Sequence, residues 1–392
     1  MIQGPLDAGL VLCSGTIGRM SNLFIGLMSG TSLDGVDGVL CDFAPRDGLV
    51  IQVIAHAHQP FDAGLAAELL ALNSSGADEL HRAALAGNAL ASIYANVVRD
   101  LLMRSQVQPS AVRAIGAHGQ TVRHRPGEFD AVGYTLQINN PALLAELSGI
   151  DVVADFRSRD VVAGGQGAPL VPAFHRAVFG RAGETVAVLN LGGIANLTAL
   201  LPDGATSGFD CGPANALMDH WCSVHKGEPF DRDGAWAATG QADIALLRRM
   251  QSDPFFGKPP PKSTGRDLFN PAWLQAMLNV APNSTSPADV QATLAELTAW
   301  AAGEAITRYA PGAGSVLVCG GGALNSHVMR RVAAHTSPAR VAPTDDEGLP
   351  ASQVEAAAFA WLAKAFVDRQ PGNLVAVTGA RGPRVLGALY PA

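Results

Sequence analysis

The sequence lacks the features that mark several broad classes of protein. Only five of its 392 residues are cysteine and none of them forms a C-x-x-C pair, which argues against a disulfide framework or a zinc site and favours reduced thiols in the cytoplasm. No apolar run approaches the roughly 18–20 residues that a membrane span needs. The first residues carry Asp7 ahead of a short apolar patch and no basic segment, so a signal peptide is not expected.

Positive charge is also scarce. The chain has 27 lysine and arginine residues against 34 aspartate and glutamate residues, a formal net charge of −7. This balance argues against nucleic acid as a partner, because nucleic acid is bound by a clustered basic surface. It also means that an anionic ligand must be met by locally placed hydrogen-bond donors. The remaining composition, 48% hydrophobic and 16% charged, is that of a globular chain long enough for two domains.

The stretch from Phe24 to Phe43 predicts a hairpin with a polar tip. Two apolar runs flank Ser29-Gly30-Thr31-Ser32, and Gly30 lets backbone N–H groups turn toward an anion while the hydroxyl groups add donors. Asp34 and Asp37 add two carboxylates, an arrangement that a bridging cation would favour. We expect a cradle for nucleotide phosphates and Mg²⁺. Taken alone, the stretch fits an ordinary glycine-rich hairpin with solvated aspartates at least as well.

A second stretch with the same pattern follows about 160 residues later. Residues 185–201 contain an apolar strand, the turn Asn190-Leu191-Gly192-Gly193 and another strand. Two such units imply a duplicated domain in which each copy presents a glycine turn to one central cleft.

Two clusters of polar residues follow predicted strands in the first half. Gly116 to Thr121 ends the strand predicted over 112–117, where α/β proteins place ligand contacts. Residues 155–160 contain two carboxylates and two guanidiniums and precede a glycine-rich loop over 164–167. Both clusters suggest a chemical site. A satisfied structural His118 and a solvated, salt-bridged loop at 155–167 remain open as alternatives.

Two more polar segments lie in the second half. We expect Asn215 to cap a helix that ends at Gly227, with Asp210 just before it in a position suited to a metal-linked nucleotide. Three glycines at 320–322 follow a predicted strand and would let a base or ribose lie against the backbone. The expected organisation is an N-terminal extension over 1–22, a first domain over 23–140 and a second domain over 141–354, with the C-terminal helix, within 355–392, packing back on the first domain.

Six segments in this order resemble anhydro-N-acetylmuramic acid kinases, within the superfamily of sugar kinases, heat-shock ATPases and actin. The segments are MSGTSLDGVD (28–37), GAHGQTVRHRP (116–126), DFRSRDVVAGGQGAPLVP (155–172), NLGGIANLT (190–198), FDCGPANALMD (209–219) and CGGGALN (319–325). The resemblance covers about residues 24–361. It implies an α/β fold of duplicated actin-like ATPase domains, each ribonuclease H-like, with a central interdomain cleft.

The resemblance also implies an activity. A cytoplasmic enzyme, usually a homodimer, would use ATP and Mg²⁺ to phosphorylate the 6-oxygen of 1,6-anhydro-N-acetylmuramic acid while water opens the anhydro bridge. The products would be N-acetylmuramic acid 6-phosphate and ADP, in peptidoglycan recycling and amino sugar catabolism. Two alternatives remain open: a simple sugar kinase of the same superfamily, and an actin-like ATP-binding assembly protein with no sugar pocket.

Residue roles follow from the same resemblance. Asp160 matches the position of the family's catalytic aspartate and is expected to act as the general base that takes a proton from the attacking water. Mg²⁺ is expected at Asp34 and Asp37. The expected sugar contacts are His118, Gln120, Thr121, Arg157 and Glu355, with Arg157 meeting the lactyl carboxylate. The expected nucleotide contacts are Ser29, Gly30, Thr31, Ser32, Leu33, Asp34, Gly35, Val36, Asp37, Gly192, Gly193, Asn196, Asp210, Gly212, Asn215, Gly320, Gly321, Gly322 and Asn325.

Overall fold

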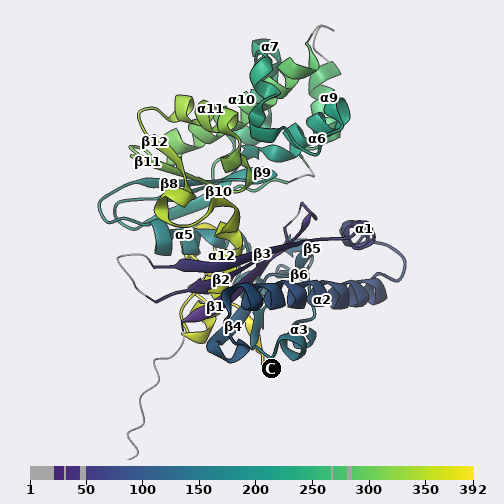
Figure 1. Cartoon of the computed structure of the whole chain (residues 1–392). Coiled ribbons are helices and arrows are strands. Elements are labelled where there is room, and N and C mark those ends of the chain that lie inside the picture. The colour runs from purple at the N-terminus through teal and green to yellow at the C-terminus, as the bar shows by residue number, and fades with distance from the viewer. Residues whose placement is uncertain (1–21, 31, 45–49, 266–267, 280–284) are drawn as a thin grey trace, which may run out of the picture.

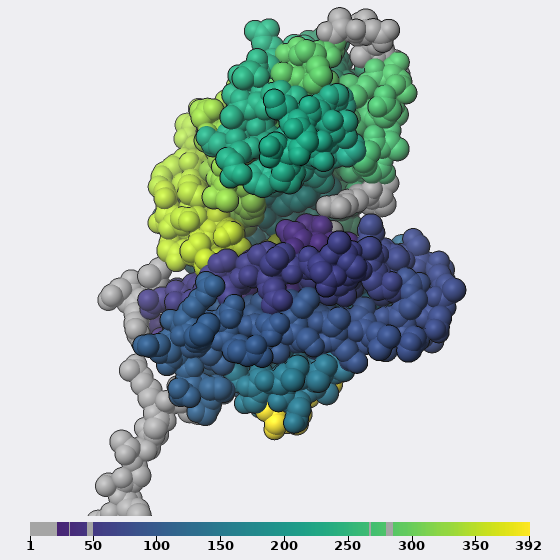
Figure 2. Space-filling view, turned by 45° about the vertical axis from the view of Figure 1, so that its right-hand side comes forward, coloured from purple at the N-terminus to yellow at the C-terminus, as the bar shows by residue number. Residues whose placement is uncertain are grey.

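Two lobes make up the structure, a computed structural model, and each lobe is built on one β-sheet (Figure 1). The structure describes residues 22–30, 32–44, 50–265, 268–279 and 285–392. Thr31 and all but the last residue of the expected N-terminal extension over 1–22 therefore lie outside the described residues. In the space-filling view a waist separates the purple and blue first lobe from the teal and green second lobe (Figure 2).

The first sheet has six strands in the order β13-β7-β4-β1-β2-β3. Strand β1 pairs antiparallel with β2, and β2 pairs antiparallel with β3. On its other side β1 pairs parallel with β4, and β4 pairs parallel with β7. The strands of this sheet are β1 (Leu23–Met28), β2 (Gly35–Asp42), β3 (Gln52–Pro60), β4 (Val112–Ala117), β7 (Val152–Ala154) and β13 (Ala388–Tyr390).

The second sheet repeats this plan with five strands in the order β10-β9-β8-β11-β12. Antiparallel pairs again join its first three strands in the chain, and β8, β11 and β12 run parallel. The predicted duplication and the α/β actin-like fold are therefore confirmed by strand order and direction. The strands are β8 (Val186–Leu191), β9 (Ile194–Leu200), β10 (Thr206–Pro213), β11 (Ser315–Cys319) and β12 (Arg340–Pro343).

Helix α12 (Val354–Val367) lies between the two sheets (Figure 1). It packs on β1 and β4, and its buried residues share one core cluster with strands of both lobes. Gly116 makes this close packing possible, because a Cβ at that position would lie 2.0 Å from the carbonyl oxygen of Phe359. The helix therefore joins the lobes through side chains and backbone that are almost entirely out of solvent.

One expected domain boundary is wrong. Residues 141–154 were expected in the second domain, but β7 pairs with β4 in the first sheet. A strand of only three residues carries no sign in the sequence of which sheet it joins. Strand β13, at the end of the chain, extends the same sheet beside β7.

Helices cover the outer faces of both sheets (Figure 1). In the described part of the chain, no helix is both long enough and apolar enough to cross a membrane. A separate two-stranded sheet is formed by β5 (Gln120–Pro126) and β6 (Gly133–Ile138). The remaining helices are α1 (Ala63–Ala71), α2 (Glu79–Ser105), α3 (Pro141–Ser148), α4 (Ser158–Val162), α5 (Val171–Phe179), α6 (Asn215–Lys226), α7 (Ile244–Gln251), α8 (Pro254–Gly257), α9 (Pro271–Asn279), α10 (Pro287–Tyr309), α11 (Ser326–Thr336) and α13 (Val375–Thr378).

Candidate functional site

The predicted residues of the first lobe meet at one edge of the first sheet. Strands β1, β4 and β7 run parallel, so the residues that follow them lie at the same edge. Ser29 follows β1, His118 follows β4, and the segment 155–160 follows β7. The structure therefore brings together three segments that are far apart in the sequence.

The turn after β1 is held by side chains from other segments. The hydroxyl group of Ser29 donates to the carbonyl oxygen of Gly119 at 3.1 Å and lies 3.0 Å from the hydroxyl group of Tyr94. The side-chain amide of Gln120 donates to the carbonyl oxygen of Gly30 at 3.0 Å. Ser29 and Gln120 are both 1% exposed. The buried side chains of Ser29 and Gln120 therefore stabilise the conformation of the turn after β1.

His118 connects the turn to Arg157. Its Nδ1 donates to the carbonyl oxygen of Ser29 at 3.2 Å, and its Nε2 accepts from Nη2 of Arg157 at 2.9 Å. Burial, aided by the charge of Arg157, lowers the pKa of His118 to about 3, so the ring is neutral and its tautomer is set by its two partners. This geometry favours the structural alternative for His118, because both ring nitrogens are already engaged.

Arg157 is half-buried near two carboxyl groups. Burial lowers the pKa of Arg157 to about 10, while Glu355 and Asp160 act in the opposite direction. Nη1 of Arg157 donates to the carbonyl oxygen of Gly167 at 2.8 Å. Burial also raises the pKa of Glu355; the charge of Arg157 opposes that rise and the charges of Asp37 and Asp34 add to it. The Arg157 guanidinium can therefore bind an anionic ligand group only through N–H groups that Gly167 and His118 do not already occupy.

The predicted Mg²⁺ ligands belong to the same group of charges. Asp34 accepts from the hydroxyl group of Ser32 at 2.6 Å, and Asp37 lies 3.1 Å from a ring nitrogen of His56 and 3.2 Å from one of His58. Among the described residues no three histidine, cysteine or acidic side chains converge closely enough to enclose an ion. Mg²⁺ does not require that, since it is usually held by one or two carboxylates together with substrate phosphates. The carboxylates of Asp34 and Asp37 therefore fit a Mg²⁺ ion held in this way.

Asp160 is completely buried. Its Oδ1 accepts from the side-chain amide of Asn373 at 2.6 Å and from the hydroxyl group of Thr378 at 2.7 Å. Its Oδ2 accepts from the backbone N–H of Gly167 at 2.8 Å. A general base must reach its water molecule, and a carboxylate that is 0% exposed with three donors already bound does not. The geometry therefore disfavours the predicted role of Asp160 as the base and favours a structural one.

Several side-chain amide atoms nearby have no hydrogen-bond partner among the described residues. The side-chain oxygens of Gln120 and Gln137 and both polar atoms of the Asn139 side chain are buried without a hydrogen bond. Gln137 and Asn139 flank Gly119, where a Cβ would lie 3.2 Å and 3.3 Å from their Cβ atoms. Buried polar groups are almost always paired, so this cluster is suited to a polar ligand. The sequence pattern missed Gln137 and Asn139, because it predicts only a strand and a helix start there; Thr121, which it did predict, accepts a hydrogen bond from Gln137 at 3.2 Å.

A row of polar side chains crosses the second sheet. Asn190 on β8 pairs with Asn196 on β9, and Asn196 pairs with Asp210 on β10. The side-chain oxygen of Asn190 is buried without a partner in the part of the chain that the structure describes. Gly320 is required at this point, since its φ is +78° and a Cβ would lie 2.3 Å from that oxygen. The predicted Asn196 and Asp210 thus lie side by side, with Asn190 as a neighbour that the predictions left out.

Asp210 has the properties of an acid–base group. Burial raises the pKa of Asp210 to about 6, against the opposing effects of the Thr264 N–H and the charge of Lys262. Oδ2 accepts from the backbone N–H of Thr264 at 2.9 Å, and Oδ1 has no partner within the described residues. Gly208 lies two residues earlier on β10 and therefore on the same face of the strand as Asp210. Gly208 approaches Pro172 and Val377, so this face is directed toward α5 and α13.

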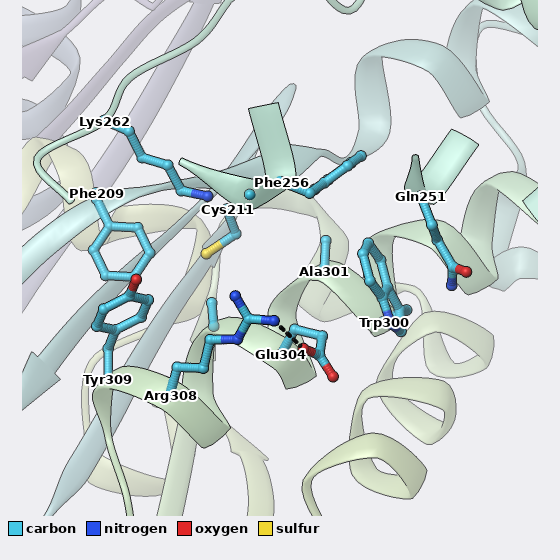
Figure 3. A pocket seen from close by; sticks show the side chains of 12 residues that line it. Phe209, Cys211, Gln251, Phe256, Lys262, Trp300, Ala301, Glu304, Arg308 and Tyr309 are labelled. Carbon is cyan, nitrogen blue, oxygen red and sulfur yellow. Dashed lines mark hydrogen bonds and ion pairs between the residues drawn. The ribbon is translucent and has the colours of Figure 1, made fainter. Parts of the chain in front are cut away.

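The opposite face of β10 borders a cavity of about 220 Å³ (Figure 3). Phe209, Cys211, Trp300 and Tyr309 line it, and Arg308 pairs with Glu304 at 3.0 Å across its floor. None of the predicted site residues lines this cavity. It is therefore separate from the polar row that contains Asp210.

The second glycine turn is bonded to the start of α6. The carbonyl oxygens of Gly192 and Gly193 accept from the backbone N–H groups of Asn215 and Ala214 at 3.0 Å and 3.1 Å. The prediction that Asn215 caps this helix is wrong: Ala214 is the capping residue, and the Asn215 amide instead donates to the carbonyl oxygen of Leu191 at 2.8 Å. The end of the helix at Gly227, with φ +70°, agrees with the prediction.

Other predicted nucleotide contacts differ in their surroundings. Val36 is 0% exposed in the core, and Gly212 lies against Phe256 on the face of β10 that borders the cavity. Asn325 caps α11 by accepting from the N–H of Val328 at 3.0 Å. Gly321 is exposed. These positions can offer backbone groups to a nucleotide, and the residue-level assignment stays a prediction.

Known proteins match the chain closely. The family model described as anhydro-N-acetylmuramic acid kinase matches residues 22–392. The relative named anhydro-N-acetylmuramic acid kinase from Variovorax paradoxus is 65% identical over 376 residues, which cover 94% of this chain and 99% of the relative. Relatives of the same name from Albidiferax ferrireducens and Bordetella petrii are 56% and 59% identical, covering 95% and 94% of this chain and 100% and 96% of the relatives.

Solved structures align more loosely. A dehydratase activator from Clostridium difficile with bound ADPNP is 12% identical, with a TM-score of 0.46, over 88% of this chain and 96% of that chain. The assignment of the fold therefore rests on the strand order of the two sheets.

Proposed function

Because the chain belongs to the anhydro-N-acetylmuramic acid kinase family, we propose that it phosphorylates the 6-oxygen of 1,6-anhydro-N-acetylmuramic acid at the expense of ATP while water opens the anhydro bridge. Water adds to the anomeric carbon and loses a proton, the bond from that carbon to the 6-oxygen breaks, and the 6-oxygen takes the γ-phosphoryl group. The products are N-acetylmuramic acid 6-phosphate and ADP. The observation that carries the hydrolytic half of this proposal is the Asp210 carboxyl group, whose pKa is raised to about 6.

Asp210 is the stronger candidate for the general base. A base works best with a pKa near the working pH and with an oxygen that water can reach. Asp210 meets the first condition, and its Oδ1 has no protein partner among the described residues. Asp160 matches the family's position, but its carboxylate already accepts three hydrogen bonds and is fully buried. We therefore assign the proton transfer to Asp210 and a structural role to Asp160.

The remaining groups support separate sites for the sugar and the nucleotide. Arg157 is the proposed partner of the lactyl carboxylate. The unpaired side-chain oxygens of Gln120 and Gln137 and the unpaired amide of Asn139 are proposed to bind the sugar's hydroxyl and acetamido groups. The turns at 29–37 and 192–193 are proposed to hold the triphosphate from the two lobes. Mg²⁺, proposed at Asp34 and Asp37, would neutralise charge on the phosphate oxygens when bound.

We also propose that the enzyme is a cytoplasmic homodimer in peptidoglycan recycling. The proposal rests on the family. Sedimentation of the purified protein should give twice the mass of one chain, and a single-chain mass at micromolar concentration would contradict the dimer.

The reaction can be tested with purified protein, ATP, MgCl₂ and 1,6-anhydro-N-acetylmuramic acid in ¹⁸O-labelled water. Mass spectrometry should find ADP and N-acetylmuramic acid 6-phosphate with one ¹⁸O at the anomeric hydroxyl, if samples are quenched before that hydroxyl exchanges with solvent. A phosphorylated sugar with an intact anhydro ring, or turnover only of ordinary sugars, would instead indicate a simple sugar kinase. Light scattering that rises with ATP, with no sugar turnover, would indicate an assembly protein.

A further inference from the structure

The C-terminal segment beyond α12 is bonded along the glycine-rich loop that follows α4. The N–H of Gln166 donates to the carbonyl oxygen of Thr378 at 2.7 Å. In return, the N–H of Arg381 donates to the carbonyl oxygen of Ala163 at 2.9 Å, and the Arg381 guanidinium donates to that of Val162 at 3.0 Å. Two segments more than 200 residues apart are thus joined through their backbones.

Two side chains of this segment meet the buried carboxylate of Asp160. Asn373 and Thr378 both donate to its Oδ1, at 2.6 Å and 2.7 Å. They are 4% and 1% exposed. Asn373 is itself fixed, because its side-chain oxygen accepts from the N–H of Arg384 at 2.7 Å. The C-terminal segment therefore determines where the Asp160 carboxylate lies.

Asp160 in turn determines the position of a peptide group that contacts Arg157. Its Oδ2 accepts from the N–H of Gly167 at 2.8 Å, and the carbonyl oxygen of Gly167 accepts from Nη1 of Arg157 at 2.8 Å. Gly167 has φ +67°, and a Cβ there would lie 2.8 Å from Val161, so this peptide has little freedom to shift. A continuous series of hydrogen bonds thus runs from Thr378 to the Arg157 guanidinium.

We propose that Asn373 and Thr378 are positioning residues that act through Asp160 and Gly167 to orient the Arg157 guanidinium, and that they set the affinity of the enzyme for an anionic sugar. This inference rests on the proposed function, in which Arg157 meets the lactyl carboxylate. The turn at Ser29 is linked to Arg157 through His118, but Tyr94 and Gln120 hold it as well, independently of Arg157. Loss of the Thr378 hydroxyl group should therefore affect the sugar and not the nucleotide.

The test compares Thr378→Val with Thr378→Ser and with the control Thr336→Val. Thr336 is also a buried threonine, and its hydroxyl group donates to the carbonyl oxygen of Val332 at 2.9 Å within α11. Calorimetry with 1,6-anhydro-N-acetylmuramic acid should give a Kd about 10-fold higher for Thr378→Val, the effect of one hydrogen bond to a charged group. Thr378→Ser and Thr336→Val should bind as the wild type does, and the Kd for ATP should stay within about twofold throughout.

A second ligand isolates the guanidinium. 1,6-Anhydro-N-acetylglucosamine lacks the lactyl carboxylate, so Thr378→Val should bind it as the wild type does. Equal weakening for both sugars, or for ATP as well, would overturn the inference, because it would indicate a general loss of structure. An unchanged Kd for the muramic sugar would overturn it too.

Hydrogen exchange tests the connection without any ligand. The N–H of Gly167 donates to the carboxylate of Asp160, and the N–H of Gly165 donates to its backbone carbonyl oxygen. Peptides that cover residues 158–170 should therefore exchange faster in Thr378→Val than in Thr336→Val, chiefly at Gly167. Equal exchange would overturn the connection, whereas wild-type protein that binds no anhydro sugar would refute the proposed function and leave this result standing. Should Thr378→Val fail to fold, Asn373→Ser removes the other donor and carries the same expectations.

Discussion

The two lobes share a strand order, but a set of polar residues around the turn of the first lobe differs from a set across the second sheet in whether the protein supplies their partners. Around the turn after β1, Ser29, His118 and Asp160 have their hydrogen-bonding groups occupied by other protein groups. Across the second sheet, the side-chain oxygen of Asn190 and Oδ1 of Asp210 have no partner in the described part of the chain. The first set stabilises the conformation of the first lobe around the turn, whereas the second set is available to bind a ligand.

This difference separates two kinds of buried polar residue. A group with its partners in place stabilises the fold, and its removal leaves those partners unpaired. A group without a partner lowers stability until a ligand binds it, and its removal affects binding or catalysis alone. Substitutions in the two sets should therefore differ in whether stability or activity changes.

The largest effect is expected from Asp210→Asn. Removal of the proposed general base should lower kcat by about 10²–10⁴-fold. The free energy of unfolding should not fall and should rise near neutral pH, because the substitution removes a carboxylate whose pKa burial raises. The amide oxygen can still accept from the Thr264 N–H. Steady-state kinetics and urea unfolding measure the two quantities. Near-normal turnover would show that Asp210 is a structural group, and the proposed difference between the two sets of polar residues would be wrong.

Asp160→Asn should show the opposite pattern. An amide group in place of the carboxylate leaves at least one of three donors unpaired in the core, which should cost about 1–3 kcal/mol of unfolding free energy. Its kcat should fall less than that of Asp210→Asn. If Asp160→Asn abolished turnover at unchanged stability, Asp160 would be the base, as the family resemblance implies.

Asn139→Ala tests the unpaired groups of the first lobe. Because no protein partner is lost, unfolding free energy should not fall. The KM for the anhydro sugar should rise about 10-fold, the effect of one lost hydrogen bond. As a matched control, Asn140→Ala should lower stability, since Asn140 caps α3 by accepting from the N–H of Leu143 at 3.0 Å. A loss of stability in Asn139→Ala would mean that its amide has a structural partner.

The smallest effect is expected from Ser29→Ala. Removal of a hydroxyl group bonded to Gly119 and Tyr94 should lower unfolding free energy by about 0.5–1.5 kcal/mol. The KM for ATP should rise only a few-fold, because Gln120 still holds the turn. A loss of activity comparable to that of Asp210→Asn would show that Ser29 contacts a ligand directly.

The fold was largely predictable from the sequence. Both glycine turns stand out between apolar runs, and their repetition predicts the duplication that the sheets confirm. The place of β7 was not predictable, since a three-residue strand has no pattern that names its partner. The short helix α4 was likewise hidden in a segment rich in charge and glycine.

The site was predictable in its residue types but less so in their roles. Residues such as His118, Asp160 and Asp210 stand out because they follow strands and glycines. Whether each is engaged depends in part on partners far away in the chain: two of the three donors to the Asp160 carboxylate lie 213 and 218 residues from it. Nothing local in the sequence shows that the carboxylate of Asp160 is enclosed or that of Asp210 is partly open.

The most direct test of this account is the pH dependence of kcat/KM for the anhydro sugar. A base must be ionised, and the pKa of Asp210 is raised to about 6, so kcat/KM should fall as the pH drops below about 6 and level off above it. That limb should persist in Asp160→Asn and vanish in the residual activity of Asp210→Asn. A limb that survives in Asp210→Asn, or that is lost in Asp160→Asn alone, would contradict the assignment of the base to Asp210.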